Sequence, residues 1–268
     1  MPTTTPDATA ADDQQLDDHD LALRLARAAG RELLAVRAAA VEAGEPAAAM
    51  KAAGDAAAQR LLSGMLASAR PDDAVLSEEA ADDGVRLTSS RVWIIDPLDG
   101  TREFSEPPRT DWAVHVALWV DGELVAGAVT LPAAAQEYGT AVPPPRPTGV
   151  PGRLRLAVSR SRPPAFVQRL AAATDAELVP MGSAGVKATS VLRDEADAYV
   201  HAGGQFEWDS AAPVAVAAAA GLHATRIDGS PLRYNQPDPS LPDLLICRPE
   251  VADMLLSQIA RLSREPSS

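Results

Sequence analysis

The sequence is poor in the residues that cross-link small secreted proteins or anchor membrane proteins. Aromatic residues make up only 4% of the 268 residues, so a hydrophobic core has to be built mainly from alanine, valine and leucine. The single cysteine, Cys247, excludes an internal disulfide and fits a reducing cytosol, so we expect a cytoplasmic protein. No stretch of about eighteen apolar residues lacks charges or helix breakers, and no basic segment leads into an apolar one at the N-terminus, which argues against a membrane span and a secretory signal.

Positive charge is also scarce. The chain has 24 Lys and Arg against 37 Asp and Glu, which gives a net charge of −13. Such a surface disfavours a nucleic-acid polymer or an anionic membrane as the partner and leaves a small molecule as the expected one. Six aspartates fall in residues 1–20, which contain no Lys or Arg, and we predict that residues 1–18 form a disordered acidic tail.

Hydrophobic periodicity predicts a mixed α/β chain. Apolar residues at helical spacing favour two long helices, from Asp17 to about Ala40 and from Ala47 or Asp55 to Ser68. Asp121-Gly122 between two β-branched runs indicates a β-hairpin. Further strands are expected at 91–96, 154–159, 176–182, 196–201 and 243–249. Further helices are expected at 163–173, 183–196 and 208–221, and a terminal helix is expected to end at about residue 261.

A proline-rich segment without periodicity, residues 142–152, interrupts these patterns. Strands cluster before it, whereas strands and helices alternate after it. We therefore predict an N-terminal α+β lobe at 19–150, which carries a metal site, and a C-terminal α/β lobe at 151–268, which completes a substrate pocket.

Acidic residues follow or flank apolar sequence at three places, each where a strand ends or a helix begins. Such ends are where functional sites are usually built. Taken singly, an acidic residue there can be a helix cap or a turn residue. The residues concerned are Glu78 and Glu79 after "AVLS", Asp96 and Asp99 in "VWIIDPLD", and Asp209 after Trp208.

Asp96 and Asp99 need more than a turn to explain them. Two carboxylates three residues apart around Pro97 can converge on one point, where they raise each other's pKa unless a cation lies between them. Mg²⁺ prefers such oxygen ligands, and no His or Cys cluster near these acids favours zinc. The amides of Gly100 and Thr101 open a possible helix, which is a phosphate-binding feature. The pattern predicts metal-assisted phosphoester hydrolysis.

Three motifs carry a family resemblance. "WIIDPLDGTREF" at 93–104 resembles the signature of the inositol-monophosphatase-like family of Mg²⁺-dependent, lithium-sensitive phosphatases. "LSEE" and "EWDSAAPVAVAAAAG" are similar to that family's Glu-Glu and C-terminal Trp-Asp elements, in the family's order. Arg102-Glu103, where inositol phosphatases typically have Thr-Asn, resembles the 3′(2′),5′-bisphosphate nucleotidases of sulfate assimilation. The resemblance covers most of residues 20–265.

The resemblance implies a layered α-β-α-β-α sandwich of the inositol monophosphatase and fructose-1,6-bisphosphatase type, existing as a monomer or homodimer. It also implies a ligand set for two Mg²⁺ ions. Glu78, Asp96 and the Leu98 carbonyl would hold the first ion, and Asp96, Asp99 and Asp209 the second. Glu78 and Thr101 would activate the attacking water, with Asp99 also in a catalytic role.

A third Mg²⁺ is left open. The family holds one with an Asp from a Val-Thr-x-x-Asp segment that follows a lysine-containing loop, and Asp55 in "MKAAGDAAAQ" is the corresponding residue. The Thr of that segment is absent here, and Lys51 stands unusually close. The alternative for Asp55 is an N-cap after Gly54.

Substrate contacts are implied at further positions. "SRSRPP" at 159–164 resembles a nucleotidase segment that commonly has His where this chain has Arg162, and "GSAGVK" at 182–187 resembles the family's Gly-Ser element. The alternatives are a solvated basic loop and a surface lysine. The four histidines are scattered and are expected to be structural or exposed. The predicted substrate-binding residues are Gly100, Thr101, Arg102, Ser159, Arg160, Ser183, Lys187 and Asp209.

The expected function is removal of the 3′-phosphate from adenosine 3′,5′-bisphosphate and its sulfated form. The same chemistry on inositol monophosphate or fructose 1,6-bisphosphate is the alternative. An inactive nucleotide-binding relative is an alternative of another class, and the complete set of acids argues against it.

Overall fold

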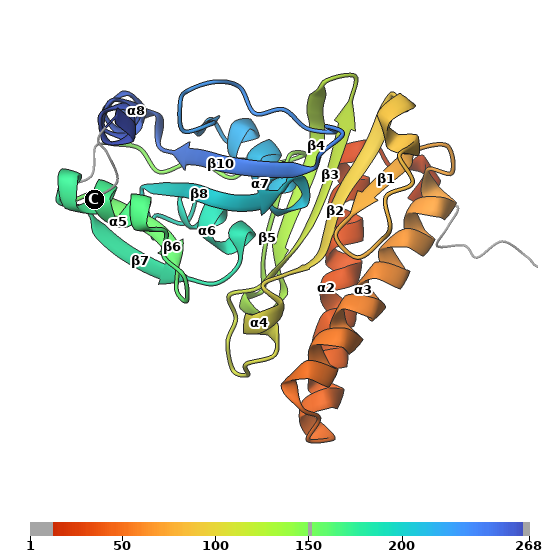
Figure 1. Cartoon of the computed structure of the whole chain (residues 1–268). Coiled ribbons are helices and arrows are strands. Elements are labelled where there is room, and N and C mark those ends of the chain that lie inside the picture. Colours follow the sequence, from red (N-terminus) through yellow and green to blue (C-terminus); the bar gives the residue numbers. More distant parts are fainter. Residues whose placement is uncertain (1–12, 150–151, 265–268) are drawn as a thin grey trace, which may run out of the picture.

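The computed structural model describes residues 13–149 and 152–264, and its elements form five layers (Figure 1). Helices α2 (Asp18–Glu42) and α3 (Ala47–Ala69) cover one face of a first sheet. Helices α6 (Ala184–Ser190) and α7 (Glu207–Ala219) lie between the first sheet and a second one. Helices α5 (Ala165–Thr174) and α8 (Pro249–Arg264) cover the outer face of the second sheet. The predicted α-β-α-β-α sandwich is therefore confirmed.

The first sheet has the order β1-β2-β3-β4-β5. Strand β1 is parallel to β2, whereas β2, β3, β4 and β5 pair antiparallel in turn, and the predicted Asp121-Gly122 turn joins β3 to β4. One-turn helix α4 (Thr101–Phe104) follows β2 directly. The strands are β1 (Ala74–Ser77), β2 (Arg91–Asp99), β3 (Ala113–Val120), β4 (Glu123–Leu131) and β5 (Gln136–Gly139). Short 3-10 helices occupy Val85–Thr88 and Pro132–Ala134.

The second sheet has the order β7-β6-β8-β10-β9. Strand β6 is parallel to both β7 and β8, while β10 runs antiparallel to β8 and β9. The strands are β6 (Arg155–Ser159), β7 (Glu177–Met181), β8 (Ala198–Phe206), β9 (His223–Thr225) and β10 (Ser240–Cys247).

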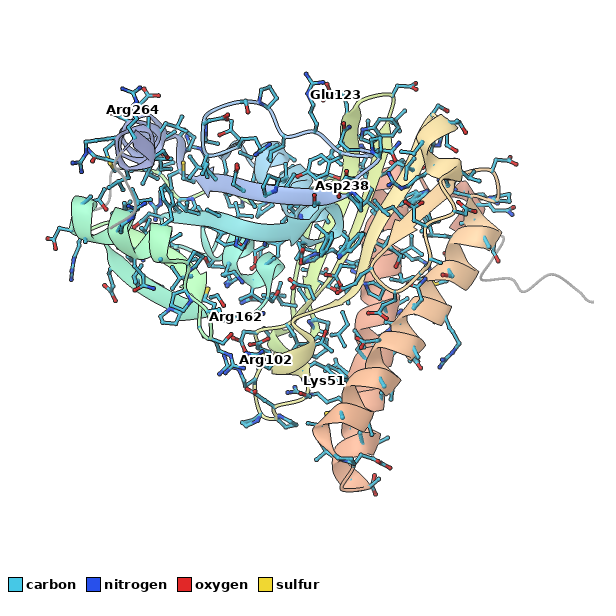
Figure 2. All side chains as sticks on the ribbon, viewed as in Figure 1. Lys51, Arg102, Glu123, Arg162, Asp238 and Arg264 are labelled. Carbon is cyan, nitrogen blue, oxygen red and sulfur yellow. The ribbon has the colours of Figure 1, made fainter. Side chains whose placement is uncertain are left out.

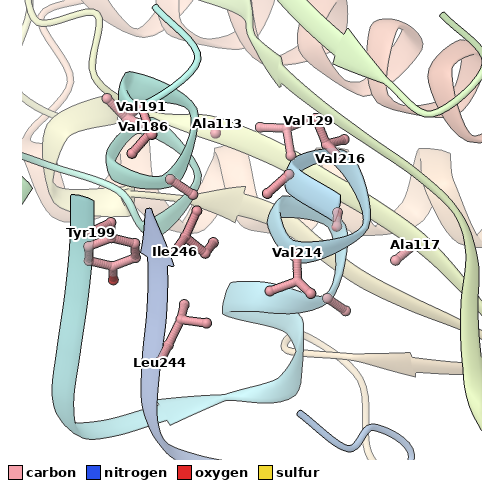
Figure 3. Packing of buried hydrophobic residues seen from close by; sticks show 14 of the residues in the cluster. Ala113, Ala117, Val129, Val186, Val191, Tyr199, Val214, Val216, Leu244 and Ile246 are labelled. Atoms are coloured by element: carbon pink, nitrogen blue, oxygen red, sulfur yellow. The ribbon is translucent and has the colours of Figure 1, made fainter. Parts of the chain in front are cut away.

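Alternation along the strands explains the layers. In β2, Val92 and Ile94 pack between the sheets, whereas Trp93 and Ile95 pack against α2 and α3. This follows from the two-residue period of a strand, and both faces are apolar because both are covered. Figure 3 shows Val214 and Val216 of α7 in the middle layer, with Val129 of the first sheet and Ile246 of the second nearby.

The predicted elements agree with the structure except at a few ends. The predicted helix at 183–196 ends at Ser190, because the chain turns at Asp194, which has a φ of 59° and binds Arg155 and Arg248. Short strands β5 and β9 were not predicted. In the sequence, segment 142–152 comes after the last strand of the first sheet and before the first strand of the second, and the division into lobes there stays a prediction.

The predicted acidic tail falls largely on residues 1–12, which lie outside the described residues. For residues 13–18 the prediction of disorder is wrong. Residues 13–15 are helical, Asp13 is buried and binds Arg24, Asp17 caps α2, and Asp18 binds Arg70. None of the helices in the described ranges is long and apolar enough to span a bilayer.

Candidate active site

A bulge at the end of β2 brings the two aspartates of the central motif to the same face. Asp96 pairs with His115 and Asp99 with Ala113, so three steps along β2 match two steps along β3. In a regular strand, residues three apart point to opposite faces, and one extra residue restores the same face. Leu98 packs instead on the side of α2 and α3. The bulge at Pro97-Leu98 thus aims both carboxylates into the space between the sheets.

Asp209 reaches the same space from the first turn of α7. Its Oδ2 accepts a hydrogen bond of 2.7 Å from the Phe206 N–H, which caps the helix. Helix α7 lies close to β4 because residue 127 is glycine: a Cβ there would be 2.7 Å from the Cβ of Ala215. Asp96, Asp99 and Asp209 each offer an oxygen within 4.8 Å of the others.

Glu78 joins this cluster from the end of β1. The strand is parallel to β2, so their carboxyl ends lie at the same sheet edge. The turn that carries Glu78 is held by Ser77, whose hydroxyl donates to Gln59 Oε1 of α3 at 2.7 Å and accepts from the Glu79 N–H at 3.3 Å. The Glu78 carboxyl interacts electrostatically with Asp209 and Asp99.

The pKa values of three of these carboxyl groups are raised because the groups are close together and shielded from water. Loss of hydration, followed by the charges of neighbouring carboxylates, raises the pKa of Glu78 to about 7 and that of Asp209 to about 6. Burial, then Asp99 and Glu78, raises the pKa of Asp96 well above its ordinary value. Four carboxyls this close are stable together as anions only with a cation between them, and their oxygen-only donor set suits Mg²⁺.

Asp99 is the exception because cations already face it. Burial alone would raise its pKa, but His115, Lys187 and the Ser183 hydroxyl together lower it. Its Oδ2 accepts hydrogen bonds from Ser183 Oγ and from the Gly185 N–H at 2.7 Å, and lies 3.1 Å from His115 Nε2. With Oδ2 so fully engaged, Oδ1 is the oxygen left for a metal ion.

His115 is a site residue that the sequence analysis did not identify. It is fully buried on β3, with Nε2 facing Asp99 and Nδ1 3.1 Å from the Trp208 carbonyl. Nε2 lies 3.1 Å from Asp99 Oδ2 without the alignment of a hydrogen bond, and the charge of Asp99 and the Trp208 carbonyl outweigh burial to raise the pKa of His115. His115 thereby ties the end of β2 to the first turn of α7. Its place in a buried run of β3 was the only signal, and it indicates burial rather than contact with Asp99.

The predicted Leu98 and Thr101 positions also come together. The Thr101 hydroxyl donates to the Leu98 carbonyl at 3.3 Å, one turn after the bulge. Thr101 and Gly100 line the same cleft as Asp99 and Asp209. The roles of the Leu98 carbonyl as a metal ligand and of the Thr101 hydroxyl in orienting the water stay predictions.

Asp55 lies in the third turn of α3, so the alternative of an N-cap is wrong. The helix begins at Ala47 after Pro46, eight residues earlier. Burial and the charge of Glu79 raise the pKa of Asp55 to about 6, and Lys51 opposes them. Asp55 is thus close to the Glu78-Glu79 turn but outside the cluster of Asp96, Asp99 and Asp209.

Beside the carboxylates, the cleft is lined by cations and hydroxyls. Its volume is about 250 Å³, and Asp99, Thr101 and Asp209 form one wall. Exposed Arg102 of α4 and exposed Arg162 of the loop after β6 lie near each other at its mouth (Figure 2). The remaining lining residues are Gly100, Glu103, Ser159, Ser161, Gly182, Ser183, Ala184, Lys187 and Gln205.

Comparison with known proteins identifies this architecture. A family model described as the inositol monophosphatase family matches residues 14–264. The chain belongs to the inositol monophosphatase family.

Members of the family with described activities are similar to this chain. It is 57% identical over 186 residues to the 3′-phosphoadenosine 5′-phosphate phosphatase of Mycobacterium bovis, covering 66% of this chain and 70% of the relative. It is 34% identical over 162 residues to the 3′(2′),5′-bisphosphate nucleotidase CysQ of Escherichia coli, covering 56% and 65%. Inositol monophosphatase II of Staphylococcus aureus superposes with a TM-score of 0.74 at 18% identity over 92% of this chain and 98% of that chain, which shows the shared fold.

The inositol monophosphatase family is metal-dependent, and the acidic cluster of Asp96, Asp99 and Asp209 is the group of described residues that suits a metal ion. The enzyme class of the chain follows from the family and from its curated relatives, which are phosphate-ester hydrolases.

Two predicted substrate contacts have other partners in this family member. The Ser183 hydroxyl donates to Asp99 and accepts from the Val186 N–H at 3.1 Å, so it positions a carboxylate and caps α6. The Arg160 guanidinium does not line the cleft and binds Glu103 and Glu106, each at 2.6 Å. These contacts position Asp99 and bind the loop after β6 to α4, and direct contact of either residue with a substrate stays a prediction.

Lys187 lies in the cleft wall, but its ammonium group is buried. Its Nζ donates to the Ser183 carbonyl and lies 5.4 Å from the centroid of the Tyr199 ring. Burial lowers its pKa, and Asp99 and Asp209 oppose that effect. Lys187 thus lies buried behind the cleft surface, and direct contact with a phosphate stays a prediction.

Gln205 is a second residue that the sequence analysis missed. It is buried in the cleft wall, its Nε2 donates to the Tyr199 hydroxyl at 2.7 Å, and its Oε1 has no partner among the described residues. Nothing in the local pattern "AGGQFEWD" distinguishes this Gln from a solvent-facing one.

Proposed function

We propose that the chain is a Mg²⁺-dependent phosphatase that removes the 3′-phosphate from adenosine 3′,5′-bisphosphate and from its sulfated form. The observation that carries the proposal is a single cleft lined both by the carboxylates Asp99 and Asp209, which we call its metal end, and by the exposed Arg102 and Arg162, which we call its arginine or substrate end. A metal-bound phosphate fits the first end, and a second phosphate fits the second. The 57% identity to a phosphatase named for this substrate class supports the same choice.

The residues that would hold the metal ions are those that crowd at the sheet edge. The family resemblance assigns Asp96 to both ions, with Glu78 and the Leu98 carbonyl for the first and Asp99 and Asp209 for the second. In support, Asp96, Asp99 and Asp209 each offer an oxygen within 4.8 Å of the others. When bound, Mg²⁺ neutralises the charge of a phosphoryl group and lowers the pKa of a coordinated water. Asp55, near Glu79, is the ligand that we propose for a third ion.

The protein's own groups hold and move the protons of the reaction. The family resemblance assigns Glu78 to accept a proton from the attacking water, and its carboxyl lies close to those of Asp99 and Asp209. The Thr101 hydroxyl, which donates to the Leu98 carbonyl, can in turn accept a hydrogen bond from that water and fix its direction. The water oxygen bonds to phosphorus, the bond to the 3′-oxygen breaks, and that oxygen gains a proton. Hydrolysis thus gives adenosine 5′-phosphate and inorganic phosphate.

Arg102 and Arg162, at the arginine end of the cleft, determine which phosphate ester of the substrate is placed at the metal ions. Arg102 and Arg162 are exposed at the cleft mouth, where a guanidinium group can bind a phosphate in bidentate fashion. On a chain with a net charge of −13, these arginines together with buried Lys187 provide local positive charge for a dianion. Inositol 1-phosphate has no second phosphate for them.

A substrate panel tests the proposal. Turnover of adenosine 3′,5′-bisphosphate, inositol 1-phosphate and fructose 1,6-bisphosphate is measured as phosphate release with Mg²⁺ and with EDTA. We expect the highest kcat/KM for the adenosine compound and none with EDTA. A higher kcat/KM for either sugar phosphate would overturn the proposed substrate. If no compound is hydrolysed in a Mg²⁺-dependent way, the proposed enzymatic activity is overturned.

A further inference from the structure

The buried carboxylate of Glu103 has no role in the chemistry described above. Glu103 is only 6% exposed and lies in α4, between Arg102 at the cleft mouth and Phe104 in the core. Its Oε1 accepts a hydrogen bond of 2.6 Å from Arg160 Nε, which lies 57 residues away in the loop after β6. A buried carboxylate is stable as an anion only with such a partner.

The pair joins the two sheets at the edge of the cleft. Helix α4 continues β2 of the first sheet, whereas Arg160 follows β6 of the second. Arg160 also donates from Nη2 to Glu106 at 2.6 Å and from its backbone N–H to the Met181 carbonyl at 3.0 Å. The Arg160 guanidinium group therefore binds two carboxylates in the segment that follows β2 of the first sheet. The Arg160 backbone is at the same time bonded to the end of β7 in the second sheet.

The neighbouring backbone is shaped around the same pair. A Cβ on residue 182 would lie 2.3 Å from Glu103 Cγ, so only glycine fits there. The Gly182 N–H donates to Asp111 Oδ2 at 2.7 Å, which holds the second sheet's strand end against the first sheet's segment. The Glu103 side chain thus packs against Gly182 and binds Arg160 at the edge of the cleft that it helps to line.

Arg160 also sets the direction of its loop. The Arg162 N–H donates to Ser159 Oγ at 3.2 Å, which folds residues 159–162 into a tight turn. Because Arg160 turns toward α4, Ser159, Ser161 and Arg162 are the residues of this turn that line the cleft. The separation between Arg162 and the carboxylate cluster therefore depends on where Arg160 is anchored.

We propose that Glu103 and Arg160 are a positioning pair that fixes the distance between the metal end of the cleft and the Arg162 loop, and so selects substrates that carry a second phosphate. This inference rests on the proposed function and deepens it. It also explains two residues of the "DGTREF" motif. Arg102 lines the cleft, and Glu103 binds Arg160 in the loop after β6, which lines the cleft through Ser159, Ser161 and Arg162.

The test measures the two ends of the cleft separately in the Mg²⁺-loaded enzyme. Inorganic phosphate, as a competitive inhibitor, probes the metal end alone, whereas adenosine 5′-phosphate and adenosine 3′,5′-bisphosphate probe the arginine end as well. For Arg160→Met we expect the KM for the bisphosphate and the inhibition constant of adenosine 5′-phosphate to rise about tenfold or more, because misplaced binding groups lose that much. The kcat and the inhibition constant of inorganic phosphate should stay within about threefold.

Companion variants keep the test decisive. Arg160→Lys retains a charge but not the two-carboxylate contact, so it should fall between wild type and Arg160→Met. Glu103→Gln should match Arg160→Met, and the double variant should be no worse than either, since the pair acts as a unit. Arg153→Met, which breaks an exposed 3.5 Å pair with Asp175 in the same half of the chain, is the matched control.

Two results would overturn the proposal. One is a KM for the bisphosphate within about twofold of wild type in Arg160→Met; the other is an equal loss for inorganic phosphate and the bisphosphate, which is what general loosening of the fold gives. If Glu103→Gln does not fold, the two Arg160 variants decide. Wild-type turnover in the substrate panel tests the proposed function by itself, so failure of either proposal is recognised independently.

Discussion

The two ends of the cleft are built in opposite ways. At the metal end, Asp96 and Asp99 terminate a buried strand and are 1% and 7% exposed. At the substrate end, Arg102 and Arg162 are exposed and lie on a one-turn helix and a loop. The metal end is crowded with like charges, whereas the substrate end has few groups that constrain one another.

This difference suggests that the carboxylates of the metal end serve catalysis, whereas the arginines of the substrate end serve the choice of substrate. Carboxylates that repel one another stay together only where strands, helix caps and His115 hold them, so a small shift there disturbs every ligand. An exposed arginine can be exchanged at little cost in stability, since it makes few contacts that the fold needs. We therefore expect changes at the metal end to abolish turnover and changes at the substrate end to alter KM.

The largest effect should come from Asp99→Asn. The variant keeps the shape of the side chain but removes one charge from the ligand set, so kcat should fall at least about tenfold, as for other losses around a metal. Phosphate release and thermal unfolding check this together, because the fold should persist. A variant that retains most of its kcat would contradict a metal role for Asp99.

His115→Ala should have the next largest effect. It removes the cation that faces Asp99 Oδ2 and ties β2 to α7, so the Mg²⁺ concentration for half-maximal activity should rise about tenfold. A Mg²⁺ titration of activity measures this. His223→Ala is the matched control, since the His223 ring hydrogen-bonds to Thr225 Oγ1 and His223 is not among the residues that line the cleft. Equal Mg²⁺ requirements in the two variants would refute the assignment.

The contrast between the ends also explains what the sequence could predict. The carboxylates were predictable because they belong to contiguous motifs at strand and helix ends. The β2 bulge was not, since simple alternation would place Asp96 and Asp99 on opposite faces. His115, Gln205 and the Glu103–Arg160 pair depend on contacts between segments far apart in the chain, and no local pattern records such contacts.

The fold shows the same division. Long helices and buried strands were predicted because their periodicity extends over many residues. Short β5 and β9 were missed, since three or four residues give no period. The early end of α6 follows from Asp194, whose ion pairs with Arg155 and Arg248 are again distant in sequence.

A pH experiment sharpens the comparison at the metal end. Without metal, the folded protein holds protons on Glu78 and Asp209 up to pKa values of about 7 and about 6, above their ordinary values of 4.5 and 3.8. Because the folded state binds these protons more tightly, their contribution to stability is present below about pH 4 and is lost as the pH rises toward 7. Mg²⁺ binds the ionised carboxylates, so its stabilising effect should grow over the same range.

Thermal unfolding with and without Mg²⁺ at pH 5 and pH 8 measures this effect, with NaCl at matched ionic strength as the control. The rise in Tm on adding Mg²⁺ should be larger at pH 8. A rise that is the same at both values would mean that the cation does not bind these carboxylates.

The smallest effect should come from Asp55→Ala, because Asp55 lies outside the tight cluster. It is near Glu79, and burial with that charge raises its pKa to about 6. If Asp55 holds a third ion, the variant should lose severalfold in kcat and need more Mg²⁺, which is less than the roughly tenfold or greater cost expected for Asp99→Asn. Asp72→Ala, an exposed change beyond the end of α3, is the control. Should both the rate and the Mg²⁺ dependence equal those of the control, the site holds two ions, and Asp55 serves only to balance Lys51.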